Sequence, residues 1–501
     1  MGVLLSGCTS TGLQVTDQTP AVTLPPAEIS YVAPIGDASL EYTAETVLYL
    51  PSRDGIGLTR TTAQVSYSPV RPDAETLVRA LLANLGNKEA FPLGGETKLS
   101  LFGTNPVEVS RDTVTVNLSA SALQLDRESL FLSCQAITNT LCELPEIQYV
   151  NVLVVDKPVG LDIANTLPMG ALQKNTALDL GAVYKQLLSR KVSQSDTISD
   201  EPFSANVTLY FPLSNTEGLV SEVRSLSFEN QIPADMIIQI LRELALGPSD
   251  PSIISPPLPL LADLLTATPT VSSSAEAAGN IISLDFAHNL YDMLDAYSIS
   301  HPQSMASLCY TLSTFFPNVS GITVGVNGSP VDQRMTTEEI DTGASQQPLL
   351  RADCSSLLLD YCDLFFASED QKTLCITHRP VPYRQASNPR MLLMELSKGP
   401  LPQDSVSDLK SVFSTDCITD TDMLGFSLSE ETLLVNFSPT FKEVGEEITP
   451  DEERLLAYSI VNTLCNSSRI KNVCFFVSGS QFDGFTGEIY WAGLFYPLPL
   501  N

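Results

Sequence analysis

The chain has few of the cationic and imidazole side chains on which many binding and catalytic proteins depend. Its 501 residues include three histidines and 27 lysines and arginines, against 58 aspartates and glutamates, so the formal net charge is −31. Because phosphate groups are bound by cationic side chains, this balance argues against a nucleic acid as a partner. Acidic residues promote solubility, and association with cations or with a basic protein is the functional alternative.

Long apolar runs and catalytic motifs are missing as well. No run reaches about 18 consecutive apolar residues, the length that a membrane-spanning helix needs. The sequence contains no G-x-S-x-G elbow, no phosphate-binding loop, no G-x-G-x-x-G turn after a strand and no H-E-x-x-H zinc motif. The histidines, His288, His301 and His378, do not have the spacing of metal ligands. We therefore predict no catalytic residue, no metal and no cofactor, and a protein that is not an enzyme.

The ten cysteines include no C-x-x-C pair, which argues against a zinc site. Apart from Cys8, nine remain, an odd number that cannot all pair within the chain. The sequence leaves room for one or two disulfides, around Cys354 and Cys362 or around Cys465 and Cys474.

The first residues carry a signal for localisation. The letters LSGC, which end at Cys8, fit the bacterial lipobox, in which the cysteine is acylated and becomes the first residue of the mature protein. We interpret residues 1–8 as a shortened lipoprotein signal and Cys8 as the lipid attachment site. Residues 9–40 are rich in Thr, Ser, Pro and Gln, and we expect them to form a flexible tether. Acyl chains on Cys8 would hold the protein on the outer face of the cytoplasmic membrane without spanning it.

One short strand pattern occurs three times, as VTVNLS at 114–119, IISLDF at 281–286 and LLVNFS at 433–438. The residues before it repeat too. Two strands around a turn are predicted in each case, because a second leucine follows ten residues after a leucine-aromatic start. The leucine pairs are Leu48 and Leu58, Leu209 and Leu219, and Leu364 and Leu374. This arrangement indicates a strand, a turn and a returning strand ahead of the repeated pattern.

Two helices accompany each copy of the pattern. The first is predicted at 73–85, 233–246 and 389–398, and the last two end in Gly-Pro, a stop signal for helices. The second carries a repeated Thr-Leu pair at Thr140, Thr311 and Thr463, and a further strand follows it. In the last copy, the letters TPDE from Thr449 form a capping box with proline at the first helical position, which predicts a firm helix start.

These repeats predict three tandem copies of one domain of roughly 130 residues. We place the copies at residues 41–173, 204–348 and 355–501, with a linker at residues 174–203. Strands and helices do not alternate strictly, so the predicted fold class is α+β. Each copy is expected to be an α/β-sandwich module in which two helices pack on a small mixed sheet.

Asn117, Asp285 and Asn436 occupy the same place in the repeated strand and are polar in all three copies. One interpretation is a strand-edge residue that forms hydrogen bonds to a turn, as Asn and Asp side chains readily do. The other is a ligand-binding position. No acidic residue recurs elsewhere across the copies, so the repeats share no group suited to acid–base catalysis.

The order of these motifs resembles the GerM-type sporulation and spore germination domain, the GerMN domain, over nearly the whole chain after the tether. The second copy is the most similar one, through the letters LYFPLS, LALGP, SLDF and ITVGVNGSPV. The resemblance implies small α+β modules akin to the ring-building motifs of secretion and sporulation complexes, without catalytic residues. It also implies a lipoprotein of spore-forming Gram-positive bacteria, associated with germination and with the channel complex between mother cell and forespore.

The sequence thus predicts a membrane-anchored, non-enzymatic scaffold of the cell envelope that acts in sporulation or spore germination. Its partners would be envelope or sporulation-complex proteins and, through the lipid on Cys8, the membrane; during sporulation it would lie between two membranes. The alternatives are a module that binds peptidoglycan or a small ligand and an envelope hydrolase, which would need paired carboxylates about 5 to 9.5 Å apart. Open sheet edges would favour the scaffold, and a deep polar pocket would favour the alternatives.

Overall fold

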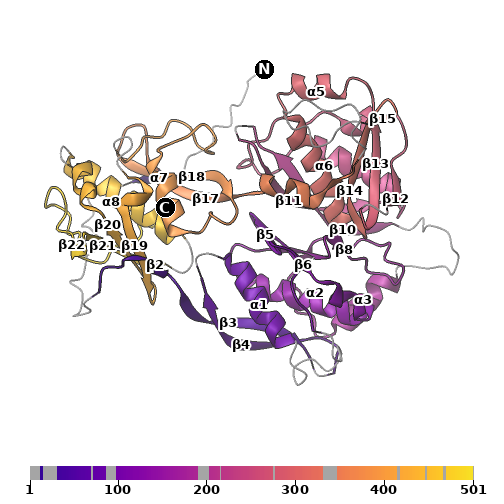
Figure 1. The fold of residues 1–501 in the computed structure, drawn as a ribbon, viewed down its shortest axis with the longest axis horizontal. Helices are drawn as coiled ribbons and strands as arrows, with labels where there is room; N and C mark the ends of the chain where they lie inside the picture. The colour runs from indigo at the N-terminus through magenta and orange to yellow at the C-terminus, as the bar shows by residue number, and fades with distance from the viewer. Residues whose placement is uncertain are drawn as a thin grey trace, which may run out of the picture. The chain divides into compact units, whose positions relative to one another are not determined.

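The computed structural model describes residues 12–14, 31–52, 54–68, 71–85, 98–189, 202–214, 216–274, 277–330, 347–413, 418–445, 448–466 and 470–499. These residues divide into two compact units. The C-terminal unit comprises the described residues of Met1–Ala44, Ser66–Pro72 and Tyr361–Asn501, and the N-terminal unit those of Glu45–Val65 and Asp73–Asp360. The fold is mixed α+β, with several small sheets packed by helices, which confirms the predicted class (Figure 1).

The first copy combines a pair of strands with a small mixed sheet. Its main elements are β3 (Tyr42–Pro51), β4 (Leu58–Tyr67), α1 (Asp73–Leu85), β5 (Val107–Ser110), β6 (Thr113–Leu118), α2 (Arg127–Leu141), β7 (Tyr149–Val154), β8 (Lys157–Pro158), β9 (Leu172–Gln173) and α3 (Leu180–Ser189). The sheet has the order β5-β6-β7-β8, and β9 also pairs with β7. β6 and β7 run parallel, and α2 is the crossover that such a pair requires.

The second copy has the same plan. Its main elements are β10 (Phe203–Pro212), β11 (Leu219–Phe228), α4 (Pro233–Ala245), β12 (Thr270–Ser274), β13 (Gly279–Phe286), α5 (Leu290–Ala296), α6 (His301–Phe315), β14 (Val319–Val326), β15 (Ser329–Pro330) and β16 (Leu349–Leu350). β13 and β14 are the parallel pair, and α6 connects them. The segment before the crossover helix forms the α-helix α5, where the first copy has the 3₁₀ helix Ala120–Gln124.

The third copy repeats the plan in the C-terminal unit and adds strands from the start of the chain. Its main elements are β17 (Leu359–Ala367), β18 (Thr373–Pro382), α7 (Pro389–Ser397), β19 (Met423–Ser429), β20 (Thr432–Phe437), α8 (Pro450–Cys465), β21 (Asn472–Val477) and β22 (Ser480–Gln481). The sheet has the order β2-β19-β20-β21-β22, where β2 is Gly36–Ser39. A second sheet of this copy has the order β1-β18-β17, in which β1 (Gly12–Gln14) pairs with β18.

The crossover helix α8 shows how local sequence and packing agree. Thr449 and Glu452 form the predicted capping box: the Thr449 hydroxyl accepts from the Glu452 N–H at 3.4 Å, and the Glu452 carboxylate accepts from the Thr449 N–H at 2.9 Å. Ile460, Val461 and Leu464 are fully buried in a core that also contains Trp491. These residues form an apolar face through which α8 packs on the core of the C-terminal unit.

Two segments differ from their expected character. Part of the expected linker 174–203 forms helix α3, in which Tyr184 packs against Phe131 and its hydroxyl donates to the Leu161 carbonyl at 2.9 Å. Part of the expected tether 9–40 forms β1 and β2. In α3 the physical reason is the burial of apolar side chains such as Tyr184, whereas β2 forms because its backbone pairs with the edge strand β19. Residues 1–11, which include Cys8, residues 15–30 of the tether and residues 190–201 of the linker lie outside the described residues.

Candidate functional site

In each copy, a repeated threonine on the crossover helix forms a hydrogen bond to the pair of strands at the start of the copy. The hydroxyl is buried and accepts a hydrogen bond from the backbone N–H of the middle residue of the leucine-aromatic start. The three bonds are Tyr49 N to Thr140 Oγ1 at 2.9 Å, Tyr210 N to Thr311 Oγ1 at 3.1 Å and Phe365 N to Thr463 Oγ1 at 3.1 Å. The Thr-Leu pair therefore recurs because its hydroxyl satisfies a strand N–H that would otherwise be buried without a partner.

Replacing Thr463 with valine should lower the unfolding free energy of the C-terminal unit by about 1–3 kcal/mol, because the buried N–H of Phe365 loses its acceptor while the side-chain volume is kept. Trp491 is the one tryptophan of the chain and is buried in that unit, so urea unfolding followed by its fluorescence measures the loss. Thr463→Ser, which keeps the hydroxyl, should lose less. Equal losses for Val and Ser would contradict this role.

The repeated Asn or Asp side chain holds the turn that follows the next strand. Asn117 Oδ1 accepts from the Asp156 N–H at 3.0 Å, and Asn117 Nδ2 donates to Asp156 Oδ1 at 2.6 Å. Asp285 Oδ1 accepts from the Gly328 N–H at 2.7 Å, and Asn436 Oδ1 accepts from the Gly479 N–H at 3.1 Å. The structure therefore places all three side chains on a turn, while a role in ligand binding stays a prediction.

The conformation of these turns explains why a polar side chain that can accept a hydrogen bond occupies the Asn/Asp position. Each is a two-residue hairpin turn in which both central residues have positive φ, as type I′ turns require. These residues are Val155 and Asp156, Asn327 and Gly328, and Ser478 and Gly479. Valine is a poor residue for this conformation, so the first turn needs its side-chain anchor most.

A small cavity of about 180 Å³ lies beside Asn117 in the N-terminal unit. Its polar lining includes Glu108, Asn117, Asp156, Arg351 and Ser355. The volume is below the range of about 300–1,000 Å³ that is usual for small-molecule sites. The cavity can hold water or a fragment of a ligand.

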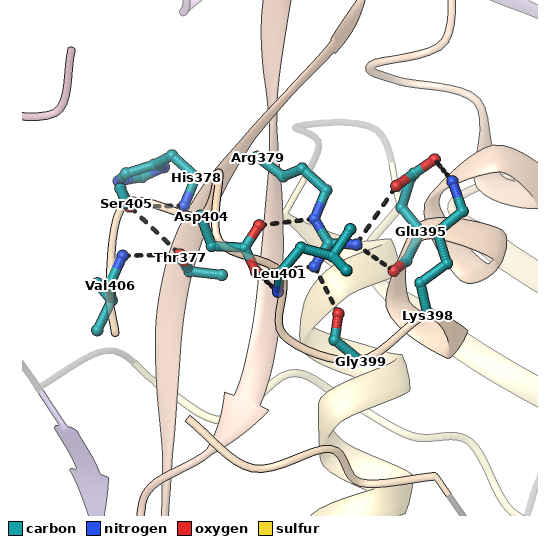
Figure 2. A network of polar contacts seen from close by, with 10 residues as sticks. All are labelled: Thr377, His378, Arg379, Glu395, Lys398, Gly399, Leu401, Asp404, Ser405 and Val406. Atoms are coloured by element: carbon teal, nitrogen blue, oxygen red, sulfur yellow. Dashed lines mark hydrogen bonds and ion pairs between the residues drawn. The ribbon is translucent and has the colours of Figure 1, made fainter. Parts of the chain in front are cut away.

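Arg379 is the centre of a buried polar network in the third copy (Figure 2). Its guanidinium forms a bidentate pair with Asp404, at 2.6 and 2.7 Å, and both side chains are fully buried. It also donates to the carbonyls of Glu395 at 2.5 Å and of Gly399 at 2.6 Å, which are left open at the end of α7. Burial disfavours its charge, but the bonds to Asp404 and Glu395 outweigh burial and raise the pKa of Arg379 above its usual value.

The second copy contains the same device and the first copy lacks it. Arg224 donates to the carbonyls of Glu243 and Gly247 at the end of α4 and pairs with Glu222 at 2.8 Å. In both copies the guanidinium lies over the phenylalanine of the leucine-aromatic start. The first copy has Ala63 at the corresponding position, five residues after Leu58, and no Gly-Pro after α1. The arginine and the Gly-Pro stop thus occur together, and our sequence analysis missed this signal.

A second buried arginine joins the first two copies. Arg351, in the 3₁₀ helix Arg351–Leu357 that follows β16, pairs with Glu108 of β5 at 2.5 Å and donates to the Thr314 hydroxyl on α6. Its guanidinium lies 4.1 Å from the centre of the Tyr310 ring, a favourable cation–π distance. Burial opposes its charge, yet Glu108 raises the pKa of Arg351 well above its usual value. The residue belongs to no repeat, so no pattern in the sequence marked it.

The histidines and cysteines show ordinary structural roles. His301 Nε2 lies 2.8 Å from Asp295 Oδ1, His378 Nδ1 lies 2.5 Å from Asp363 Oδ1, and His288 is exposed.

The described cysteines are free, so neither of the pairs considered from the sequence is bonded; Cys8 and Cys417 lie outside the described residues. Burial raises the pKa of Cys134 and Cys465 to about 12 and that of Cys142 and Cys474 to about 11. Because the thiolate is the reactive form, these thiols are inert at neutral pH.

The described residues contain neither a candidate metal centre nor a candidate membrane-spanning helix. Within them, no three His, Cys, Asp or Glu side chains converge as a metal site would require. None of the helices in the part that the structure describes has the length and apolar character to cross a membrane.

Comparison with known proteins connects the repeats to a family. The model of a family described as "Germane: Sporulation and spore germination" matches residues 47–160 and 363–483. Similar solved structures include the tandem GerMN domains of the sporulation protein GerM from Bacillus subtilis, with 16% identity, coverage of 59% of this chain and 98% of that chain, and a TM-score of 0.22. A candidate lipoprotein from Clostridium perfringens has 18% identity, coverage of 28% and 87%, and a TM-score of 0.19. No curated protein matches the chain.

The family match falls on the first and third copies. These two copies match a GerMN (Germane) domain, as the resemblance of their motifs predicted. The second copy, which the motifs indicated as the most similar, lies outside both matched segments although it shares the order of strands and helices. Its α-helix α5 lies where the other two copies have the 3₁₀ helices Ala120–Gln124 and Pro439–Gly445.

Proposed function

We propose that the chain is a non-enzymatic interaction protein of the bacterial cell envelope that acts in sporulation or spore germination. The family match of the first and third copies supports the biological process. The observation that carries the proposal is that the polar side chains shared between copies, at the threonine, Asn/Asp and arginine positions, make contacts inside each copy. Shared chemistry therefore builds the module, and the surface of each copy remains for partners.

The proposed location is the outer face of the cytoplasmic membrane. The lipobox that ends at Cys8 supports it, since a diacylated cysteine anchors a protein without a spanning helix. The proposed partners are envelope or sporulation-complex proteins, and the membrane itself through the lipid. The net charge of −31 suits a partner with a basic surface.

Peptidoglycan is the alternative ligand, and the cavity beside Asn117 is the observation that favours it. Carboxylates, amides and hydroxyls are the groups with which proteins bind sugars, and Glu108, Asn117 and Ser355 provide them here. Against it, Glu108 and Asn117 are already paired within the protein, with Arg351 and Asp156. The scaffold role is therefore the one that we favour.

Crosslinking in native membranes tests the proposal. The full-length acylated chain would be crosslinked in sporulating and in vegetative cells, and the linked residues would be mapped. We expect protein crosslinks that occur in sporulating cells and cluster on the surface of one copy, and we expect Cys8→Ser to release the chain from the membrane. Crosslinks to wall glycan in both cell states would support the alternative. Normal sporulation, germination and envelope integrity after deletion would refute the proposed role.

A further inference from the structure

Residues 31–40 add a strand to the edge of the third copy's sheet. β2 runs parallel to β19, with Gly36 opposite Gly425 and Ser39 opposite Ser427. A Cβ atom at Gly425 would lie 2.6 Å from the Gly36 nitrogen and 2.8 Å from the Pro34 oxygen. Only glycine therefore allows the two backbones to approach this closely.

Side chains hold the added strand as well. Arg390 donates to both carboxylate oxygens of Asp37, at 2.6 and 2.8 Å. Leu40 is buried in the core of the C-terminal unit, and Tyr31 packs against the cluster around Leu434. The contact thus combines backbone pairing, a bidentate ion pair and apolar burial, which are the three parts of a strand-addition site.

The edge that accepts the added strand is specific to the third copy. Asn436 holds the Pro34 carbonyl through its amide nitrogen at 2.9 Å. In the first copy the amide nitrogen of Asn117 is taken by Asp156, and Pro106 lies across from Asn117 where the third copy has Gly425. In the second copy the corresponding side chain, the carboxylate of Asp285, has no N–H to donate. The third copy alone combines the glycine with an amide that reaches the added strand.

We propose that β19 is a strand-exchange site, at which residues 31–40 of a second copy of this chain replace the chain's own segment. Every group that holds the segment belongs to the C-terminal unit, so a second copy brings the same complementary residues without any change. The segment continues at Glu45 into the N-terminal unit, so each exchange links two chains. Reciprocal exchange closes a dimer, and non-reciprocal exchange extends a row of molecules.

The chain's own segment has the advantage of a high effective concentration, so a test must weaken the internal contact and keep the external one. Asp37→Arg faces Arg390 within its own chain, and Arg390→Glu faces Asp37 within its own chain, so each variant repels its own segment. In a mixture, both exchanged contacts are between opposite charges. Repulsion of the Arg390→Glu side chain by the neighbouring Asp420 is the same in either state and cancels. Glutamate at the start of α7 also suits the helix dipole.

Mass photometry of the purified full-length variants gives the readout. We expect each variant alone to be monomeric and the mixture to raise the dimer fraction roughly tenfold or more, as like-charge contacts are exchanged for opposite ones. The double variant Asp37→Arg/Arg390→Glu restores the internal pair and should be monomeric. A mixture that stays monomeric while each variant keeps Trp491 buried would overturn the inference.

A second measurement covers the case in which a variant fails to fold. Two wild-type preparations of different isotopic mass would be unfolded and refolded together, at high and at low concentration, and examined by native mass spectrometry. Mixed dimers at high concentration are expected, and their absence would also overturn the inference. Because the experiment uses purified protein, its outcome is independent of the proposed role in the envelope.

Discussion

Replacing Arg379 with methionine is expected to lower the unfolding free energy of the C-terminal unit by about 3–5 kcal/mol, the usual cost of removing one partner from a buried ion pair. Methionine keeps much of the side-chain volume but leaves Asp404 fully buried without a counterion. The carbonyls of Glu395 and Gly399 at the end of α7 lose their donor too. Urea unfolding followed by Trp491 fluorescence measures the change, since this residue lies in the same core.

Arg224→Met is the matched control, because this arginine does the same work in the other unit. It should leave the Trp491 transition unchanged and destabilise the N-terminal unit by less, since the Arg224 side chain is 13% exposed and water reaches its partners. Adding Asp404→Asn to Arg379→Met should recover part of the loss, because the amide carries no charge. If Arg224→Met shifts the urea unfolding transition seen by Trp491 fluorescence as much as Arg379→Met does, the loss of the Arg379–Asp404 ion pair is not the cause of that shift.

Elements with local signals could be predicted from the sequence. Helix α1 occupies Asp73–Leu85, the predicted range, and α8 begins at the predicted capping box of Thr449 and Glu452. Such signals lie within a turn of the residues that they affect. Three repeats of the same order strengthened them, because a chance pattern does not repeat with its surroundings.

Pairings between distant segments could not be predicted in this way. The residues of β2, GDAS, have low strand propensity, and this segment forms a strand because β19 offers a free edge. Pro34 and Asn436, which form a hydrogen bond there, are 402 residues apart in the sequence. Helix α3 was overlooked for another reason. Leu180, Tyr184 and Leu187 have helical spacing, but the polar residues that surround them are typical of a linker.

The candidate site was predicted in its positions more than in its chemistry. Asn117, Asp285 and Asn436 were recognised as one repeated position, but the type I′ turns that they anchor depend on the backbone of a later strand. Arg379 could have been recognised, since Arg224 stands at the same distance from its leucine. Its partner could not, because Asp404 comes from a loop, whereas Arg224 pairs with Glu222 of its own strand.

Replacing Arg351 with methionine is expected to loosen the contact between the first two copies, at a cost of about 3–5 kcal/mol to the N-terminal unit. Arg351 pairs with Glu108 of the first copy and lies over Tyr310 of the second, and its side chain is 4% exposed. Without Arg351, the buried Glu108 carboxylate has no counterion from this group. Among the described residues, it keeps only the hydrogen bond from the Tyr310 hydroxyl, which is 3.3 Å away. Amide hydrogen exchange should become faster in β5 and α6.

A double-mutant cycle separates the ion pair from the packing of the arginine. Glu108→Gln removes the charge that Arg351→Met leaves unpaired, so the double variant should be more stable than Arg351→Met. The Trp491 transition is the internal control, because Trp491 belongs to the other unit and should not shift. If the two substitutions simply add, the arginine acts through its stacking on Tyr310 and not through Glu108. If exchange stays slow in β5, the first two copies are held together by their other contacts, such as the hydroxyl of Ser221 on the carbonyl of Ser110.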